Sequence, residues 1–536
     1  MIKLLVTDEL SEEGLEMLRG GGQVHVDVRP NIPHEELMKI IGDYDALIIR
    51  SGTKVTAEVI EAGKNLKVVG RAGVGVDNVD VKAATRRGIL VMNTPSANII
   101  SAAEHTMAMM MSMARNIVWA DASLKKGEWK RSKFTGFELN GKTLGIVGIG
   151  RVGGEVAKRA KSFQMKLVGY DPYISPEVAV KLGVRLMPLE QVIEEADVIT
   201  IHAALTPSTH HLISKELLAK MKPNAIILNV ARGELIDEEA LYEVLKDKRI
   251  AGAALDVFEK EPPTGSKLLT LDNIVVTPHL GASTKEAQEK VSVEMAEHVK
   301  MFLLDKRISN AVNAPVRGMD PKVVPFISVA ERLGAFAVQL TDAPVAKVQV
   351  TVYGELATVD AKMLAVSALM GVLSNLSGEQ PNIINAELIA KEKGIQVVES
   401  KVEESKRYVN MISVSLQSDG VRREVRGTAF PGSEPRLLGI DEYDLDLPLE
   451  GDFLLSIHAD MPGIIGRIGT MLGSKNINIA QMGLGRDQKG GKALMLVSVD
   501  SPVSEAVVKE MAAVKGFQEV RSVELSKIGN RDYLQI

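Results

Sequence analysis

The chain has 536 residues, of which 45% are hydrophobic and 25% are charged, with a formal net charge of -5 and no cysteine. Because this length exceeds what a single hydrophobic core supports, we expect roughly three or four domains. The lack of cysteine excludes disulfides, thiolate nucleophiles and cysteine-ligated metals, and the acidic balance argues against a nucleic-acid partner.

Membrane, export and metal signals are also missing from the sequence. No apolar run is long enough to span a bilayer, and the nine histidines lack the paired spacing of a metal site. The N-terminal "MIKLLVTDEL" has no small-residue cleavage site, and it is predicted to be a strand rather than a signal peptide. We therefore expect a cytoplasmic protein with no metal and no membrane partner.

The first part of the chain alternates apolar strands with helical patterns. Strands are predicted at "KLLVTDEL", "VHVDV", "DALIIRS" and "LKVVGRAG", with helices that begin near Ser11, Pro33 and Thr56. Such alternation is typical of a parallel sheet that is covered by helices.

The segment "LGIVGIGRVGGEVAKRA", which begins at Leu144, joins a strand to a helix through three spaced glycines. Gly148 permits a tight turn, Gly150 lets backbone amides approach a pyrophosphate, and Gly153 lets the helix pack on the strand. The helix N-terminus adds unpaired N–H groups and a positive dipole end. This pattern predicts a dinucleotide-binding turn, although such a turn usually opens its domain and here follows a long preceding segment.

Asp171, in "VGYDP", lies at the end of the next predicted strand, about twenty residues beyond the glycines. A carboxylate at this place accepts hydrogen bonds from the ribose hydroxyls and repels a 2′-phosphate, so NAD is favoured over NADP. The alternative is an Asp that only starts the turn before Pro172. The strand before the glycines and the helix after them favour cofactor binding.

The glycine turn opens a second series of six predicted strands, which fits a doubly wound sheet. The strands are "TLGIVGIG", "KLVGYDP", "DVITIHAAL", "AIILNVARG", "AGAALDVF" and "NIVVTPHLG". Three polar residues, Arg232, Glu261 and His279, fall at the ends of strands in this series. Taken singly, each has an ordinary structural explanation as a solvated charge or a turn residue, but the three together, downstream of an NAD turn, favour a catalytic site.

Oxidation of an alcohol by hydride transfer needs a base for the hydroxyl proton and a cation that holds the substrate. His279 suits the base, because imidazole titrates near neutrality. Glu261 would orient the ring and stabilise its charged form. Arg232 would bind a carboxylate through its guanidinium fork.

The methionine-rich "HTMAMMMSMARNI" is predicted to be a core or subunit-packing helix rather than a binding groove. His105 in this segment is expected to be a hydrogen-bonded core residue, not a ligand. Further on, "SNAVNAPVRGMDPKVVPF", from Ser309 to Phe326, is typical of a domain boundary.

Two further modules follow this boundary. The first is predicted to be α+β and runs to about Leu447, with "KVQVTVYGE", two helical patterns, "MISVSLQSDG" and "REVRGTAF". The second begins near Asp452 and runs strand, helix, strand, strand, helix, strand, which is the ferredoxin-like order.

Five motifs together resemble the D-isomer-specific 2-hydroxyacid dehydrogenases: "GIGRVG", "YDP", "NVARGELID", "ALDVFEKEPP" and "VTPHLGAST". The resemblance implies a doubly wound Rossmann domain inserted in a flavodoxin-like substrate domain, which explains the late glycine turn. A helix that begins near Gln288 would cross back to the substrate domain, the lid. The implied division is a lid of 1–97 and 288–316, an NAD-binding domain of 98–287, an intervening regulatory domain of 317–450, and a last domain of 451–536 that resembles an ACT domain.

Further motifs, and the two C-terminal modules, resemble the long-form members of this family, which act on a phosphorylated substrate. The motifs are "IIRSGTKV", "GRAGVGVDNVD" and "NTPSANIISAAEHTMAMMMSMARNI". The resemblance implies oxidation of 3-phospho-D-glycerate to 3-phosphohydroxypyruvate, the first step of serine synthesis, by a homodimer or homotetramer. The alternatives are an enzyme for another D-2-hydroxy acid, such as a glyoxylate or hydroxypyruvate reductase, and a non-catalytic NAD-sensing protein.

The same resemblance implies ligand contacts for specific residues. The substrate would bind Arg50, Arg71, Asn98 and Arg232, while Arg131 and Lys133 would reach the partner subunit's site; for these last two the alternative is a solvated basic loop. Asp256 would hold the nicotinamide carboxamide. The full set of implied NAD contacts is Gly148, Gly150, Arg151, Val152, Gly153, Asp171, Thr206, Ala231, Asp256, His279 and Ala282.

In the ACT-like module, "IHADMPGIIGRIGTML" places a Pro-Gly turn at a helix start, where free amides can receive a carboxylate. The resemblance implies serine as an effector, with contacts at His458, Asp460 and Asn478. Asp460 stands where some relatives carry Asn, which leaves the effector open. The alternative is a dimerisation module that binds nothing.

Overall fold

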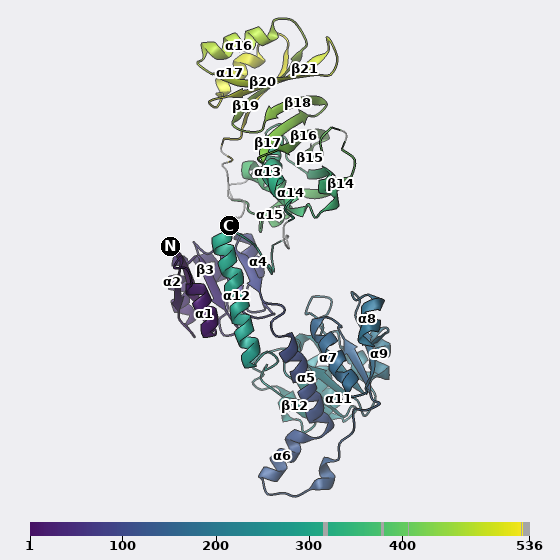
Figure 1. The fold of residues 1–536 in the computed structure, drawn as a ribbon. Helices are drawn as coiled ribbons and strands as arrows, with labels where there is room; N and C mark the ends of the chain where they lie inside the picture. The colour runs from purple at the N-terminus through teal and green to yellow at the C-terminus, as the bar shows by residue number, and fades with distance from the viewer. Residues whose placement is uncertain (315–319, 377–379, 406, 527, 529–536) are drawn as a thin grey trace. The chain divides into compact units, whose positions relative to one another are not determined.

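The computed structural model describes residues 1–314, 320–376, 380–405, 407–526 and 528, and within them the chain forms four β-sheets (Figure 1). The chain divides into two compact units, one of residues 1–9, 16–93 and 295–536 and the other of residues 10–15 and 94–294. The predicted boundary at Ser309–Phe326 falls partly outside the described residues, since 315–319 are not among them.

The N-terminal sheet is parallel, with the strand order β2-β1-β3-β4-β5. This is the flavodoxin-like order, so the predicted fold of this part is confirmed. Its strands are β1 (Ile2–Val6), β2 (Val24–Val28), β3 (Ala46–Ile49), β4 (Val68–Arg71) and β5 (Leu90–Asn93), and its helices are α1 (Glu12–Arg19), α2 (His34–Ile40), α3 (Ala57–Ala62) and α4 (Val81–Arg86). The short strand β5 was not predicted from the sequence.

Helix α12 (Lys285–Asp305) returns the chain to this N-terminal sheet. Its residues Met295 and Val299 pack against Gly70 of β4, where an added Cβ would lie 2.6 Å from Met295 Sδ and 2.9 Å from Val299 Cγ2. Beyond the helix, Asn313 accepts a hydrogen bond from the Val91 amide at 2.8 Å. The chain therefore leaves the first sheet after β5, and it returns to pack against that sheet only after the second unit.

The second unit contains a seven-stranded sheet of order β12-β11-β10-β9-β6-β7-β8, in which every pair is parallel. This is the doubly wound order predicted from the glycine turn. The strands are β6 (Thr143–Val147), β7 (Lys166–Tyr170), β8 (Arg185–Leu186), β9 (Val198–Ile201), β10 (Ile226–Asn229), β11 (Gly252–Leu255) and β12 (Ile274–Val276). The two-residue edge strand β8 is an addition to the six predicted strands, because it is too short to show a periodic pattern.

Helices cover both faces of this sheet, as Figure 1 shows. One apolar core packs α9 (Leu189–Glu195), α10 (Lys215–Ala219) and α11 (Glu238–Lys246) on the sheet, and the other packs the methionine-rich α5 (Ile99–Ala114) and α7 (Arg151–Ser162). Met107, Met109, Met110 and Met113 of α5 are buried, which agrees with the predicted packing helix. The remaining helices of this unit are α6 (Ile117–Lys125) and α8 (Pro176–Leu182).

The third sheet has the order β14-β13-β15-β16-β17-β18, with a parallel β13–β14 pair and antiparallel pairs elsewhere. Its strands are β13 (Lys347–Gly354), β14 (Gln396–Val402), β15 (Asn410–Ser418), β16 (Val421–Phe430), β17 (Glu434–Ile440) and β18 (Tyr443–Pro448), and its helices are α13 (Val324–Val338), α14 (Lys362–Leu376) and α15 (Ala386–Glu392). The α+β class is as predicted, but α13, β14, β17 and β18 were not.

The last sheet has the order β20-β21-β19-β22, and its elements follow the predicted ferredoxin-like sequence. They are β19 (Asp452–Ala459), α16 (Ile464–Ser474), β20 (Ile479–Arg486), β21 (Lys492–Val499), α17 (Glu505–Ala512) and β22 (Phe517–Glu524). Among the described residues, no helix combines the length and the apolar character needed to cross a membrane.

The close contact at Gly70 gives a prediction for stability. In Gly70→Ala the added methyl group must displace Met295 and Val299, so overpacking should lower the free energy of unfolding by about 1–3 kcal/mol. Urea denaturation would measure the loss, and hydrogen exchange at the β4 amides would locate it. Gly466→Ala in α16 is the matched control, because no atom lies within 4 Å of its added Cβ and it should not lose stability. Equal stability of the two variants would contradict the prediction.

Candidate functional site

The three glycines at the junction of β6 and α7, the last of them inside α7, have three different surroundings. Gly148 has a φ of 90°, and a Cβ there would lie 2.7 Å from the Ala203 amide nitrogen. A Cβ on Gly153 would lie 2.1 Å from the Gly148 carbonyl oxygen, so only glycine lets α7 approach the strand. Gly150 is the N-cap of α7, and its Cβ position has no atom within 4 Å. The space beside Gly150, at the N-terminus of α7, is thus open, and this is the glycine that was predicted to let backbone amides approach a pyrophosphate.

Asp171 and Arg151, two further predicted cofactor contacts, lie beside this turn. Asp171, directly after β7, accepts hydrogen bonds from the Ile149 amide at 2.8 Å and from the Tyr173 amide at 2.9 Å. The carboxylate therefore joins the end of β7 to the glycine turn. Its bond to the Tyr173 amide is the contact expected of an Asp that starts the turn before Pro172, so the structure contains that alternative as well. Arg151 is exposed and its Nη1 donates to the Pro95 carbonyl at 3.2 Å.

Most other predicted cofactor contacts lie beyond the carboxyl ends of neighbouring parallel strands, where doubly wound sheets bind ligands. Thr206 is exposed in the loop after β9, and Ala231 and Ala282 lie after β10 and β12. Val152, in the first turn of α7, packs against the core under that helix. The fold thus gathers these positions along one edge of the second sheet.

Arg232 is held by a turn that begins at the buried Asn229. The Asn229 side chain accepts from the Ala231 amide at 3.0 Å and donates to the Arg232 carbonyl at 2.8 Å. A Cβ on Gly233 would lie 1.9 Å from the Phe258 carbonyl carbon, so this glycine lets the turn pack against the loop after β11. Asn229 was missed by the sequence analysis; its signal is a polar residue at the end of an apolar strand.

Glu261 and His279 are in direct contact. His279 Nδ1 lies 2.8 Å from Glu261 Oε2, and the Phe258 amide donates to Glu261 Oε1 at 3.2 Å. Burial raises the pKa of the Glu261 carboxyl, but the hydrogen bond and charge of His279, the Phe258 amide and the charge of Arg232 outweigh it and hold this pKa below its usual value. The structure therefore brings these two of the three predicted catalytic side chains together, with the Arg232 charge acting on Glu261.

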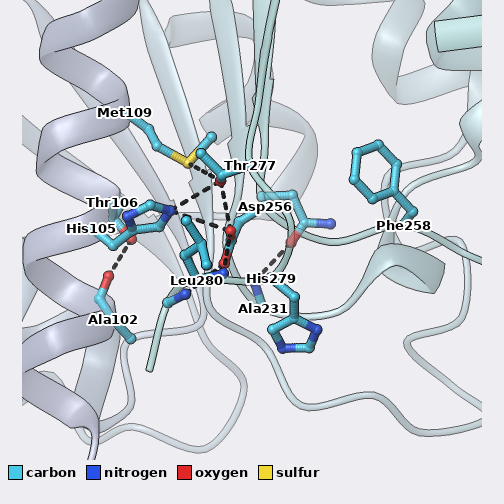
Figure 2. Close-up of polar contacts among 12 residues, drawn as sticks. Ala102, His105, Thr106, Met109, Ala231, Asp256, Phe258, Thr277, His279 and Leu280 are labelled. Carbon is cyan, nitrogen blue, oxygen red and sulfur yellow. Dashed lines mark hydrogen bonds and ion pairs between the residues drawn. The ribbon is translucent and has the colours of Figure 1, made fainter. Parts of the chain in front are cut away.

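The main chain at His279 has an unusual conformation. Its φ is 55°, in the left-handed region that non-glycine residues seldom adopt. The His279 amide donates to the Asp256 carbonyl at 2.8 Å, and the amides of Leu280 and Gly281 donate to the two Asp256 carboxylate oxygens at 2.7 and 2.8 Å. Figure 2 shows the His279 ring pointing away from the Asp256 carboxylate that holds its loop.

Asp256 itself is fully buried at the end of β11. Burial raises the pKa of its carboxyl, but hydrogen bonds from His105, Thr277, Leu280 and Gly281 more than offset this effect, so the pKa lies below its usual value. The carboxylate that was predicted to hold the nicotinamide carboxamide thus already organises the loop after β12. Thr277, whose hydroxyl donates to Asp256 at 2.6 Å, was not singled out from the sequence.

The predicted substrate residues of the first unit also follow parallel strands. Arg50 comes directly after β3 and Arg71 ends the neighbouring β4, so both lie at one edge of that sheet. The Arg50 amide donates to Asp8 at 2.7 Å, and Arg50 Nη1 donates to the Glu9 carbonyl at 3.3 Å. A Cβ on Gly73 would lie 1.5 Å from Arg71 Nη1, so this glycine makes room for the guanidinium.

The other predicted substrate residues belong to the second unit. Asn98 is the N-cap residue of α5, without a side-chain capping bond. Arg131 and Lys133 are exposed on a single 3-10 turn (Arg131–Phe134), where Lys133 Nζ lies 5.8 Å from the centre of the Phe134 ring. The structure does not place these last two residues beside Arg232 or His279.

The predicted effector residues of the last domain each have local surroundings. His458 is buried on β19, and its Nε2 has no hydrogen-bond partner among the described residues. Asp460 lies 3.3 Å from Arg486 Nε and accepts from the Gly490 amide at 3.0 Å. Asn478 donates to Asp500 at 2.6 Å. No hydrogen bond joins His458, Asp460 and Asn478 to one another in the described part of the chain.

Three family models match the chain. Residues 107–281 match "D-isomer specific 2-hydroxyacid dehydrogenase, NAD binding domain", residues 322–441 match "D-3-phosphoglycerate dehydrogenase intervening domain", and residues 453–516 match "ACT domain". The matches occur in the order predicted from the sequence.

Similar proteins extend over nearly the whole chain. The D-3-phosphoglycerate dehydrogenases of Methanocaldococcus jannaschii and Archaeoglobus fulgidus are 46% and 44% identical, each over 98% of this chain and 100% of the relative. Among solved structures, the TT0316 protein from Thermus thermophilus matches with a TM-score of 0.54 at 38% identity, over 58% of this chain and 100% of its own. D-lactate dehydrogenase from Aquifex aeolicus, complexed with NAD and lactic acid, matches with a TM-score of 0.52 at 28% identity and the same coverage. The chain belongs to the D-3-phosphoglycerate dehydrogenase family, within the D-isomer-specific 2-hydroxyacid dehydrogenases, and is an NAD-dependent oxidoreductase.

Proposed function

We propose that this enzyme oxidises 3-phospho-D-glycerate to 3-phosphohydroxypyruvate with NAD, the first step of serine synthesis. The observation that carries the proposal is the 2.8 Å contact between His279 Nδ1 and Glu261 Oε2. This base and its carboxylate lie within a chain that is similar along its length to D-3-phosphoglycerate dehydrogenases. A non-catalytic NAD sensor would have no use for such a pair.

The chemistry of the pair follows from its hydrogen bonding. A carboxylate only accepts, so the neutral His279 ring carries its proton on Nδ1, toward Glu261, and its Nε2 has the lone pair of a base. In the oxidation Nε2 takes the proton of the substrate hydroxyl, and Glu261 stabilises the imidazolium that results. Arg232 holds the substrate carboxylate through its guanidinium.

The residues around the glycine turn suit the cofactor. The open N-terminus of α7 at Gly150 would receive the pyrophosphate, and Asp171 would accept from the ribose hydroxyls, because both lie at the carboxyl edge of the sheet. NAD bound there supplies the acceptor for the hydride that leaves the substrate carbon. The 2′-phosphate of NADP would be repelled by Asp171.

We also propose that Arg50, Arg71 and Asn98 contact the phosphorylated substrate. Fixed guanidinium groups suit a substrate that carries both a phosphate and a carboxylate. Arg131 and Lys133, on their exposed turn, would serve the site of a partner subunit in a homodimer or homotetramer. The domain division given by the resemblance, a cytoplasmic location and serine as the effector of the ACT domain complete the proposal.

Rate measurements with several acids test the identity of the substrate. The kcat/KM for NADH formation from 3-phospho-D-glycerate and NAD should exceed the values for D-lactate, D-glycerate and glycolate by about a hundredfold or more, because a site built to bind the phosphate loses those contacts with a substrate that lacks it. Absorbance at the NADH band measures each rate. Equal or higher kcat/KM for an unphosphorylated acid would assign the enzyme to another 2-hydroxy acid, and no turnover of any of them would favour the NAD sensor.

The contact between Glu261 and the proposed base gives a pH prediction. The pKa of Glu261 is lowered, so its carboxylate stays ionised from neutral pH down past its ordinary value, and its stabilising contact is lost only as the pH falls through the lowered pKa. Glu261→Gln removes the negative charge that favours the protonated imidazole. We expect kcat to fall by at least about tenfold and the acidic limb of the pH–rate profile to move to lower pH.

His279→Ala is the companion variant for this experiment. It should abolish turnover at every pH while NADH still binds, which protein fluorescence can follow. If Glu261→Gln keeps the acidic limb of the parent enzyme, the pair does not control the base. Near-normal turnover in His279→Ala would assign the base to another residue.

Regulation by serine has a separate test. Serine should lower turnover and raise the melting temperature of the parent enzyme, because a ligand of the folded state stabilises it. Asn478→Ala should abolish both responses, and the exposed Lys489→Ala, in the loop between β20 and β21, should keep them. A parent enzyme that responds to serine in neither measurement would show that serine is not the effector.

A further inference from the structure

His105 of α5 belongs to the same hydrogen-bonded group as Asp256. Its Nε2 lies 3.3 Å from Asp256 Oδ1 and 3.1 Å from Thr277 Oγ1, and its side chain is 19% exposed (Figure 2). Figure 2 shows that His105 approaches the carboxylate from the side of α5, whereas His279 lies on the other side. The His105 ring therefore contacts the Asp256 carboxylate from α5, whereas His279 contacts the Asp256 carbonyl through its main-chain amide, from the loop after β12.

The hydrogen bonds around Asp256 assign the protons. A carboxylate can only accept, so His105 Nε2 carries a hydrogen where it faces Asp256. The Thr277 hydroxyl donates to Asp256 Oδ1 at 2.6 Å, so its oxygen accepts from the same imidazole N–H. His105 thus fixes both the carboxylate and the hydroxyl that supports it.

Asp256 in turn fixes the loop that carries the base. Its carbonyl accepts from the His279 amide, and its carboxylate oxygens accept from the next two amides, of Leu280 and Gly281. A Cβ on Gly281 would lie 3.2 Å from Asp256 Oδ2, so this close approach leaves little room for movement. A left-handed φ of 55° at His279 is retained only where the surroundings hold it.

We propose that His105 is a positioning residue for His279 and acts through Asp256. Its N–H keeps the Asp256 carboxylate turned toward the Leu280 and Gly281 amides, and these amides keep the loop in the conformation that aims the imidazole of His279. The inference rests on the proposed function, in which His279 is the base. It assigns a role to a histidine that the sequence analysis expected to be an ordinary core residue.

Two substitutions separate this role from simple packing. His105→Leu fills the space but removes the N–H donor, and His105→Gln keeps an amide donor at a similar reach. We expect kcat of His105→Leu to fall by about tenfold or more, as small displacements of a catalytic group do, with NADH affinity and melting temperature close to those of the parent. His105→Gln should recover most of the loss.

An isotope effect shows which step has slowed. With substrate deuterated at the carbon that loses the hydride, the effect on kcat should be larger in His105→Leu than in the parent enzyme, because a misplaced base slows the chemical step and not product release. Glu104→Gln, at the neighbouring exposed position of α5, is the matched control and should behave as the parent. Unchanged kcat in His105→Leu, or a loss of NADH binding and stability that His105→Gln fails to restore, would overturn the inference.

A spectroscopic readout keeps the test independent of turnover. In protein labelled with ¹⁵N-histidine, the ring signals of His279 are identified by their loss in His279→Ala. They should shift in His105→Leu and return toward their original positions in His105→Gln. If the His279 signals stay in place in His105→Leu, the inference fails even when the substrate assays succeed. If the signals move as expected in a protein that turns over no substrate, the proposed function fails, and the structural link between the two histidines stands.

Discussion

The second unit is organised around one buried carboxylate. Asp256 lies at the end of a strand within an apolar sheet, where an unpaired charge would be very costly. Donors from three places satisfy it: His105 from α5, Thr277 after β12, and the amides of Leu280 and Gly281. The carboxylate stays ionised because the loop donates to it, and the loop keeps its left-handed turn because the carboxylate accepts.

In this arrangement two histidines contact two different carboxylates. His279 is half-exposed and its ring contacts Glu261 through Nδ1, and in the proposed mechanism its second nitrogen takes the substrate proton. His105 is mostly buried and faces Asp256, and its proposed contribution is the geometry of the loop. Residue type alone does not distinguish the two; the carboxylate partner and the access to solvent do.

The strand order explains how distant motifs reach one edge of the sheet. Parallel strands with crossover helices end on the same side, so the loops after β6, β7, β10, β11 and β12 lie along one edge, although the residues they carry span Gly148 to His279. Small residues then bring the loops closer. Gly233 lets the Arg232 turn contact the Phe258 backbone, and Gly153 lets α7 approach β6. The site therefore follows from topology and from backbone approach.

The sequence by itself determined the fold class and the position of the glycine turn, and it singled out Arg232, Glu261 and His279 as candidate catalytic residues, because strand periodicity and motif spacing are local properties of the chain. It did not reveal the two-residue β8, which has too few residues for a pattern, or the tasks of Asn229 and Thr277, which depend on partners elsewhere in the chain. Only the tertiary structure decided that His105 faces Asp256, since 151 positions of sequence separate them and the packing of α5 on the sheet brings them within 3.3 Å. A side chain's hydrogen-bond partner is a property of the packed fold, and local pattern does not encode it.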